Sequence, residues 1–283
     1  MNYLKIKETI IKICILISYI SLFIIISYHL LINIHQKTYQ IIQSTSQSQE
    51  FQFITKQPKL KLKTTCSRNI CTNFKEIKVG NISDKYFISY TQLYNPKQSF
   101  LILYVHGQNE VFNNKKYMNK LQTWAKLLNK NNNILVAPNL FSNSIDNAMS
   151  FNEILLMTSK LKIMFPNIKI YLLAFSRGGM IAYKIIANKK LLDQFDKIII
   201  LAGVLPYKIL TLETCTNIRE NYNKIEIYHG NSDMNVPSKL STNVLIRFCN
   251  NKGYKITNSI KYFNDYDHWK LGYTKNIYEF LNY

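Results

Sequence analysis

The pattern of apolar and polar residues changes along this chain and divides it into two parts. Residues 13–34 form a largely apolar run, ICILISYISLFIIISYHLLINI, of 22 residues without a formal charge. A helix of that length measures roughly 33 Å, which is enough to cross the roughly 30 Å hydrocarbon core of a bilayer. The pattern therefore predicts a transmembrane signal anchor over residues 13–34.

The charges on either side of this run predict its orientation. Lys5, Lys7 and Lys12 precede it, whereas only Lys37 follows closely, ahead of uncharged polar residues. Because basic residues favour the cytosolic side, we expect residues 1–12 in the cytosol and the bulk of the chain in the lumen or outside the cell. A cleaved signal peptide and a buried helix of a soluble fold are the alternatives. A signal peptide would need a shorter apolar region and a small-residue cleavage site, which the sequence lacks.

From residue 75 onward, short β-rich segments alternate with segments of helical spacing. Strands are expected at residues 75–79, 86–93, 100–105, 134–137, 169–174, 197–201, 224–228 and 256–263. Helices are expected at residues 116–128, 151–164, 177–188, 238–250 and 271–281. Hairpin-like strands followed by alternating strands and helices predict an α/β fold, a mostly parallel sheet with helices on both faces. Residues 35–74, which lack an apolar period, are interpreted as a stalk before a domain over residues 75–283.

Composition and charge narrow the class of protein. The chain has 283 residues, of which 47% are hydrophobic and 18% are charged, and this excludes a disordered chain. Its net charge of +20 comes from 32 Lys and 4 Arg against 16 acidic residues, and the lysines are scattered along the sequence. Nucleic-acid recognition relies on Arg, so we expect no nucleic-acid partner. Compositional drift is the favoured explanation of the charge, and a basic surface facing anionic lipids or an acidic partner is the alternative.

Four cysteines lie beyond the apolar run, in the part that is expected to face an oxidising compartment. An even number there is typical of disulfides, and we favour Cys66–Cys71 and Cys215–Cys249 because each pair links neighbouring elements. Free thiols are the alternative. No cysteine pair accompanies a histidine pair at zinc-finger spacing, so we expect no metal site. Asn81 begins an Asn-Ile-Ser sequon and is a candidate glycosylation site.

A serine between small residues lies at a predicted junction of strand and helix. The sequence LLAFSRGGM spans residues 172–180 and places Ser176 just after the strand. A nucleophile elbow needs this context, because side chains two residues before or after the serine would collide with the crossing strand and helix. Ala174 and Gly178 occupy those positions, so the usual G-x-S-x-G reads A-x-S-x-G. The pattern indicates Ser176 as the candidate nucleophile.

A second loop, His106-Gly107-Gln108, follows the predicted strand over residues 100–105. A tetrahedral oxyanion needs two preorganised donors, and backbone N–H groups at a glycine-containing turn provide them. We expect the backbone amides of Gln108 and Arg177 to be these donors. His106 is interpreted as a structural residue that hydrogen-bonds nearby backbone, in preference to a residue that transfers protons.

The remaining candidate residues follow the last two predicted strands. Asp233 lies in the sequence HGNSDMNVP, and His268 lies in the sequence DYDHW. An aspartate in a tight turn can hydrogen-bond an imidazole and keep it in one tautomer. Asp265 and Asp267 are alternative acids, but their closeness in sequence to His268 favours a role in shaping or solvating the loop.

Taken together, the strand followed by His-Gly, the elbow serine, the HGxxDxxVP segment and the last histidine resemble the α/β-hydrolase family over residues 75–283. The resemblance implies an eight-stranded sheet and a serine hydrolase that needs no cofactor. It also implies that Ser176 is the nucleophile, His268 the general base and acid, and Asp233 the orienting acid. Ala174 departs from the glycine of the family pattern but is still small.

The leading functional hypothesis is a membrane-anchored serine hydrolase that cleaves a carboxylic ester or thioester through an acyl-enzyme. Its expected partners are a small-molecule or lipid acyl substrate and the membrane. The alternatives are a serine peptidase of the prolyl-oligopeptidase type and a catalytically silent hydrolase fold used for binding. Too few residues separate the strands at 197–201 and 224–228 for a large cap domain, so we expect an open site or a small lid.

Overall fold

The structure, a computed structural model, describes residues 66–67, 70–79, 82–108, 110–140, 148–275 and 277–281. The predicted transmembrane segment over residues 13–34, the sequon at Asn81 and most of the predicted stalk lie outside these ranges. Within them, every helix is too short or too polar to span a bilayer. The signal anchor, its orientation and the glycosylation site therefore stay predictions.

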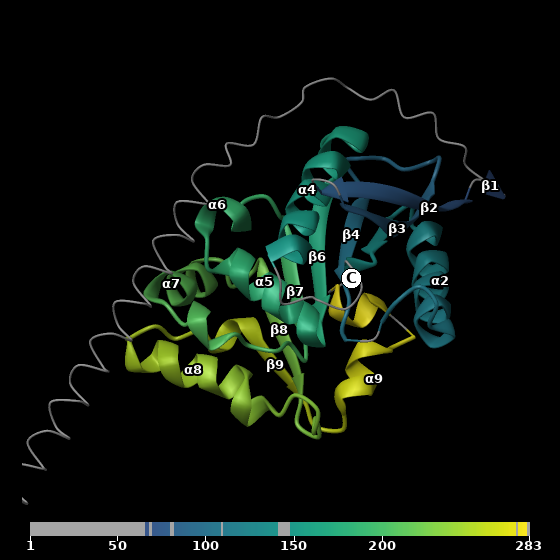
Figure 1. Cartoon of the computed structure of the whole chain (residues 1–283). Helices are drawn as coiled ribbons and strands as arrows, with labels where there is room; N and C mark the ends of the chain where they lie inside the picture. Colours follow the sequence, from purple (N-terminus) through teal and green to yellow (C-terminus); the bar gives the residue numbers. More distant parts are fainter. Residues whose placement is uncertain are drawn as a thin grey trace, which may run out of the picture. The chain divides into compact units, whose positions relative to one another are not determined.

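One mixed sheet carries the fold, and it has nine strands within the described ranges (Figure 1). The strands are β1 (Cys66–Ser67), β2 (Ile70–Val79), β3 (Ile82–Thr91), β4 (Phe100–Val105), β5 (Ile134–Pro138), β6 (Lys169–Phe175), β7 (Lys197–Leu201), β8 (Ile225–Gly230) and β9 (Ile260–Phe263). Their order is β1-β2-β3-β5-β4-β6-β7-β8-β9. β1, β2 and β3 pair in antiparallel fashion, and β3 is antiparallel to β5. The six strands β4–β9 run parallel to one another. The predicted α/β class is confirmed.

The sheet begins earlier in the chain than predicted. β1 and the first part of β2 come from residues 66–74, which the sequence analysis assigned to the stalk. Among the side chains of β2 that the structure describes, the buried apolar ones are Cys71 and Ile77, while Thr72 and Phe74 are exposed. A strand near a sheet edge buries one face weakly, so its sequence carries little period-2 signal. The eight strands that were predicted correspond to β2–β9, and β1 is additional.

Helices cover both faces of the sheet, as predicted (Figure 1). On one face, helices α4, α5, α7 and α8 contribute to one hydrophobic core; on the other, helices α2 and α9 contribute to a second. Their bounds are α2 (Lys115–Lys130), α4 (Ala148–Met164), α5 (Gly179–Ile186), α6 (Lys189–Leu192), α7 (Leu212–Glu220), α8 (Thr242–Asn251) and α9 (His268–Gly272).

Two helical predictions need correction. The helix predicted over residues 271–281 is in fact α9, which begins at His268, followed by the 3-10 helix η5 (Ile277–Phe280). The short helices α6 and α7 were not predicted. In α7 the buried apolar residues are Cys215 and Ile218, so its sequence has little apolar period. Tertiary contacts rather than local pattern therefore specify these segments.

The centre of the sheet explains why some strands are apolar throughout. Every residue of β4 is buried, because β5 and β6 pair along its two edges while helices cover both faces. Such a strand has no polar side, and its sequence FLILYV shows no alternation. The carboxyl ends of β4, β6, β8 and β9 lie at one edge of the sheet, where ligands bind in folds of this kind.

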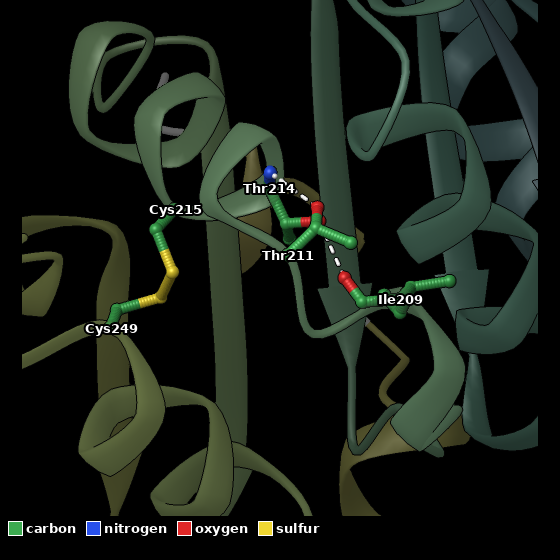
Figure 2. The surroundings of a disulfide bond; sticks show 5 residues. All are labelled: Ile209, Thr211, Thr214, Cys215 and Cys249. Carbon is green, nitrogen blue, oxygen red and sulfur yellow. Dashed lines mark hydrogen bonds between the residues drawn. A yellow bond between two sulfur atoms is a disulfide. The ribbon is translucent and has the colours of Figure 1, made fainter. Parts of the chain in front are cut away.

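One of the two predicted cysteine pairs forms a disulfide between described residues. Cys215 of α7 and Cys249 of α8 form a disulfide with a Cα–Cα distance of 5.4 Å (Figure 2), so this pairing is confirmed. Cys71 is also disulfide-bonded, and its Cα lies opposite that of Cys66 in the register of β1 and β2. The side chain of Cys66 lies outside what the structure describes, so the bond between Cys66 and Cys71 stays a prediction.

Candidate active site

Ser176 lies on a sharp turn between β6 and α5, as the sequence predicts. It begins the 3-10 helix η1 (Ser176–Gly178), and its φ angle of 54° is in the left-handed region that L-residues seldom adopt. A Cβ atom at Gly178 would lie 2.3 Å from the carbonyl oxygen of Val105, so only glycine fits there. Ala174 is fully buried and pairs with Val105 in the sheet. The requirement for small residues on both sides of Ser176 is therefore met.

Ser176, His268 and Asp233 form one hydrogen-bonded chain, although they come from three separate loops. The Ser176 Oγ lies 2.9 Å from His268 Nε2, and His268 Nδ1 lies 2.8 Å from Asp233 Oδ2. A carboxylate only accepts hydrogen bonds, so Nδ1 carries the proton and Nε2 is left to accept from the serine hydroxyl. All three residues are at least 93% buried, since their exposed fractions are 7%, 4% and 3%.

Asp233 is held in place by its own loop. Its Oδ1 accepts hydrogen bonds from the N–H groups of Asn235 at 2.9 Å and Val236 at 2.8 Å. The other carboxylate oxygen is thereby directed to His268. A second buried histidine, His229, has its Nε2 3.8 Å from Asp233 Oδ2, but this nitrogen hydrogen-bonds the Val236 carbonyl at 2.6 Å. Burial lowers the pKa of His229, which favours its neutral form.

Asp267 shapes the loop and Asp265 is solvated, in line with the roles expected of the two alternative acids. Asp267 is the N-cap of α9 and accepts a hydrogen bond from the N–H of Lys270 at 2.7 Å. Asp265 is exposed, and its backbone carbonyl accepts from the ammonium group of Lys270 at 3.2 Å. Neither carboxylate lies in the hydrogen-bonded chain with His268.

The loop His106-Gly107-Gln108, called the HGQ loop below, runs directly beside the serine. A Cβ atom at Gly107 would lie 3.1 Å from the Cβ of Ser176. His106 is fully buried, and its ring nitrogens lie 2.7 Å from the Gly107 carbonyl and 3.1 Å from the Asn139 carbonyl. Its structural interpretation is confirmed. Gln108 follows Gly107 and Arg177 follows Ser176 in the sequence, and the use of their amides as oxyanion donors stays a prediction.

Two charged residues beside the site were not found by sequence reasoning. Glu110 and Lys120 form a buried ion pair beneath the HGQ loop, with side chains 1% and 3% exposed. Burial lowers the pKa of Lys120 to about 8, although the Glu110 carboxylate opposes this shift. One signal was present: Lys120 falls within the apolar stripe of α2, three residues after Tyr117 and four before Trp124.

The described segment between β7 and β8 holds no large covering domain. Between β7 and β8 the chain forms only the 3-10 helix η2 (Tyr207–Ile209) and α7, as expected from the short spacing. Met234 and Trp269, each next in sequence to a residue of the hydrogen-bonded chain, are 85% and 45% exposed. They place apolar surface at the edge of the site.

Comparisons with known proteins identify the family of this chain. A family model described as phospholipase/carboxylesterase matches residues 85–270, which is more than half of the chain. No curated protein matches the chain.

Solved structures show the same fold at low sequence identity. The esterase Est1E from Butyrivibrio proteoclasticus is 13% identical, with a TM-score of 0.50 over 71% of this chain and 91% of its own. An acylaminoacyl peptidase from Pyrococcus horikoshii is 13% identical with a TM-score of 0.50, and the match covers 74% of this chain but 38% of the peptidase. A protein of unknown function from Agrobacterium tumefaciens, described as an α/β hydrolase, is 10% identical, with a TM-score of 0.51 over 74% of this chain and 92% of its own.

At these identities the structures establish the fold alone, whereas the family model covers the strand, elbow and histidine segments described above. The chain therefore belongs to the phospholipase/carboxylesterase family of α/β hydrolases, and it is a serine hydrolase.

Proposed function

We propose that this protein hydrolyses a carboxylic ester or thioester through an acyl-enzyme, with Ser176 as nucleophile, His268 as general base and acid, and Asp233 as orienting acid. The observation that carries the proposal is the hydrogen-bonded chain from Ser176 through His268 to Asp233, with the serine on a strained turn. This is the constellation of groups that activates a hydroxyl for attack on a carbonyl.

In acylation, the Ser176 Oγ bonds to the substrate carbonyl carbon while its proton passes to His268 Nε2. The carbonyl π electrons move to the oxygen, and the backbone N–H groups of Gln108 and Arg177 stabilise the resulting oxyanion. When the intermediate collapses, the bond to the leaving alcohol or thiol breaks, and that group takes the proton from His268. The product of this half-reaction is the Ser176 ester of the acyl group.

Deacylation repeats these steps with water as the nucleophile. His268 takes a proton from the water, whose oxygen bonds to the acyl carbon, and the oxyanion is stabilised by the same two amides. Collapse breaks the bond to Ser176 Oγ, which recovers its proton from His268 and releases the carboxylic acid. The Asp233 carboxylate stays ionised throughout and stabilises the imidazolium that forms twice in each cycle.

The substrate class follows from the surroundings of the serine. The lack of a large covering domain between β7 and β8 leaves room for an acyl compound, and the exposed Met234 and Trp269 offer apolar contact beside the reacting groups. The predicted signal anchor over residues 13–34 supports tethering to a membrane with the domain on the lumenal or extracellular side. A net charge of +20 is compatible with anionic head groups nearby and with a lipid or other acylated substrate.

Labelling with a fluorophosphonate probe tests the proposal directly. Wild-type protein should be labelled, Ser176→Ala should not, and Ser232→Ala should label normally because that exposed hydroxyl bonds the Asn264 carbonyl instead. Hydrolysis of p-nitrophenyl esters of increasing acyl length, with a peptide substrate alongside, should then show ester cleavage that depends on Ser176. A folded wild-type protein that takes no label would support a silent binding fold, and faster cleavage of the peptide would support a peptidase.

A further inference from the structure

The side chain of Lys120 lies at a meeting point of three segments of the site. Lys120 extends from the middle of α2, and its ammonium group contacts Glu110, donates to the Tyr104 hydroxyl at 2.7 Å and donates to the Gly272 carbonyl at 3.2 Å. The same group lies 5.5 Å from the ring centre of Phe175, the residue before Ser176. The buried ammonium group of Lys120 therefore lies near Phe175, just before the nucleophile turn, and hydrogen-bonds the last residue of helix α9.

Glu110 connects this cation to the HGQ loop. Its Oε2 accepts hydrogen bonds from the Gly107 N–H at 2.8 Å and from the Tyr104 hydroxyl at 2.7 Å, while its Oε1 pairs with Lys120. The pair thus binds the backbone on both sides of the serine, at Gly107 and at Gly272. Hydrogen bonds to charged groups are roughly twice as strong as neutral ones. The hydrogen bonds to the Gly107 N–H and to the Gly272 carbonyl both involve a charged group.

Each attached glycine lies next to a group that takes part in the proposed reaction. Gly107 immediately precedes Gln108, whose amide is the proposed oxyanion donor. Gly272 ends α9, which begins with His268, and a Cβ atom there would lie 2.1 Å from the ring of Phe175. The rings of Phe175 and His268 are 4.8 Å apart between centroids. A shift of either glycine would therefore displace the oxyanion donor or the imidazole relative to the serine.

Stability alone is a weak reason for a charged pair in this position. Taking two charges out of water costs several kcal/mol for each ion, and replacing a buried ion pair by apolar residues of similar volume is often neutral or stabilising. Here the pair contributes what an apolar pair lacks, since it has an acceptor for Gly107 N–H and a donor for the Gly272 carbonyl.

We infer that Glu110 and Lys120 are positioning residues, which together hold the HGQ loop and helix α9 at the geometry that the oxyanion and the imidazole require. The inference rests on the proposed function. It predicts that loss of the pair lowers kcat, because the oxyanion donor and the imidazole are no longer held in place in the transition state. KM should change little.

A paired substitution tests this without leaving a lone buried charge. Glu110→Met together with Lys120→Met keeps the volume and removes both charges. The matched control is Lys197→Met with Glu226→Met. This ion pair of 3.3 Å has side chains only 12% and 9% exposed, and it lies at the amino ends of β7 and β8, whereas the site lies at the carboxyl ends of the strands.

For the Glu110 and Lys120 variant we expect kcat on a p-nitrophenyl ester to fall about 10- to 100-fold, with KM within about threefold of the wild-type value. Amide hydrogen exchange at Gly107 should also be faster than in the wild type. The control pair should keep the wild-type kcat and the wild-type exchange at Gly107. Equal kcat values for the two paired variants, or unchanged exchange at Gly107, would overturn the inference.

Two further measurements apply if the paired variant does not fold or if the proposed function is wrong. If the paired variant does not fold, Glu110→Gln keeps the shape but removes the charge that pairs with Lys120, and wild-type kcat in that variant together with faster exchange at Gly107 would also overturn the inference. Ser176→Ala is assayed in parallel. Undiminished hydrolysis by that variant would refute the proposed function, whereas the exchange measurement at Gly107 still tests the positioning of the loop.

Discussion

At the scale of single residues, the two oxygens of Asp233 have different partners. The Oδ1 atom accepts from two backbone N–H groups of its own loop, and the Oδ2 atom accepts from His268 Nδ1. A carboxylate offers only acceptors, so it determines which nitrogen of the imidazole carries the proton. Other acids in the neighbourhood, such as Asp267, cap the helix and leave the imidazole untouched.

Substitution of Asp233 by Asn therefore has a specific expected effect. The Asn side chain can donate to Nδ1, which places the imidazole proton on Nε2 and leaves no acceptor for the serine hydroxyl. We expect kcat to fall by about 10³- to 10⁴-fold, with little change in the unfolding transition. Steady-state ester hydrolysis and thermal unfolding measure the two effects. Asp267→Asn is the control, because Asn is also a good N-cap, and an equal loss there would show that the wrong acid has been assigned.

Glu153 is a residue whose environment conflicts with its charge. It lies on α4, is fully buried, and within the described ranges neither carboxyl oxygen has a hydrogen-bond partner. Burial, with a smaller contribution from the Asp84 charge, raises its pKa to about 9. At neutral pH the Glu153 carboxyl therefore carries a proton in the folded protein, whereas in the unfolded chain it has released that proton.

The pH dependence of stability follows from this difference in proton binding. An ordinary Glu ionises near pH 4.5, so the free energy of unfolding should decrease as pH rises from about 4.5 to about 9 and change no further from this cause above it. Glu153→Gln should remove this dependence and stabilise the protein more at pH 9 than at pH 5. Urea unfolding at pH 5, 7 and 9 measures it, with the exposed Glu220→Gln as control. Parallel pH profiles for wild type and Glu153→Gln would contradict the prediction.

At the scale of elements, the disulfide joins two helices that cover the same face of the sheet. Cys215 belongs to α7, a helix with few apolar residues, and Cys249 belongs to the more amphipathic α8 (Figure 2). Thr211 caps α7 by accepting from the N–H of Thr214, so the short helix has a cap at one end and a covalent link nearby. The link therefore compensates for the weak apolar packing of α7.

Removal of this disulfide should lower stability measurably. The bond closes a loop of 34 residues, for which the loss of chain entropy in the unfolded state corresponds to about 3–4 kcal/mol. We expect Cys215→Ser with Cys249→Ser to lower the free energy of unfolding by about that amount, with kcat nearly unchanged, since the cysteines belong to α7 and α8 and not to the segments that carry Ser176, Asp233 and His268. Denaturant titration and ester hydrolysis measure these quantities. A variant with wild-type stability would show that other contacts of α7 and α8 suffice.

At the scale of the whole molecule, the chain combines a hydrolase domain with an N-terminal segment of a different character. The three lysines before the apolar run, the single lysine close behind it and the disulfide-bonded cysteines all indicate the same orientation. The compartment decides which substrates reach Ser176, so the orientation matters for function as much as the geometry of the site does.

Protease added to sealed microsomes should therefore spare the domain and digest it only after detergent is added. Non-reducing gels should show a faster-migrating form than reducing gels, because the disulfides keep the unfolded chain more compact. An otherwise identical chain in which Lys5, Lys7 and Lys12 are replaced by Glu serves as a control, and its protection should decrease. Digestion without detergent, together with free thiols at Cys215 and Cys249, would refute the orientation.

By itself, the sequence determined the features that depend on local sterics and on apolar periodicity. The fully apolar strands and the small residues around Ser176 were recognisable because each depends on a few neighbouring residues, whereas the resemblance to a known family grouped Ser176, Asp233 and His268. The pairing of Cys215 with Cys249 was also predicted, since neighbouring segments of the chain were expected to be linked.

Contacts between residues that are distant in the sequence became apparent only in the folded molecule. The early start of the sheet, the short helices α6 and α7, and the pairing of Glu110 with Lys120 beneath the site depend on partners far away in the sequence. The hydrogen bond from Lys120 to the Gly272 carbonyl spans 152 residues. A local pattern carries no record of such a contact, because the burial that makes it strong exists only after the sheet and both helical layers have assembled.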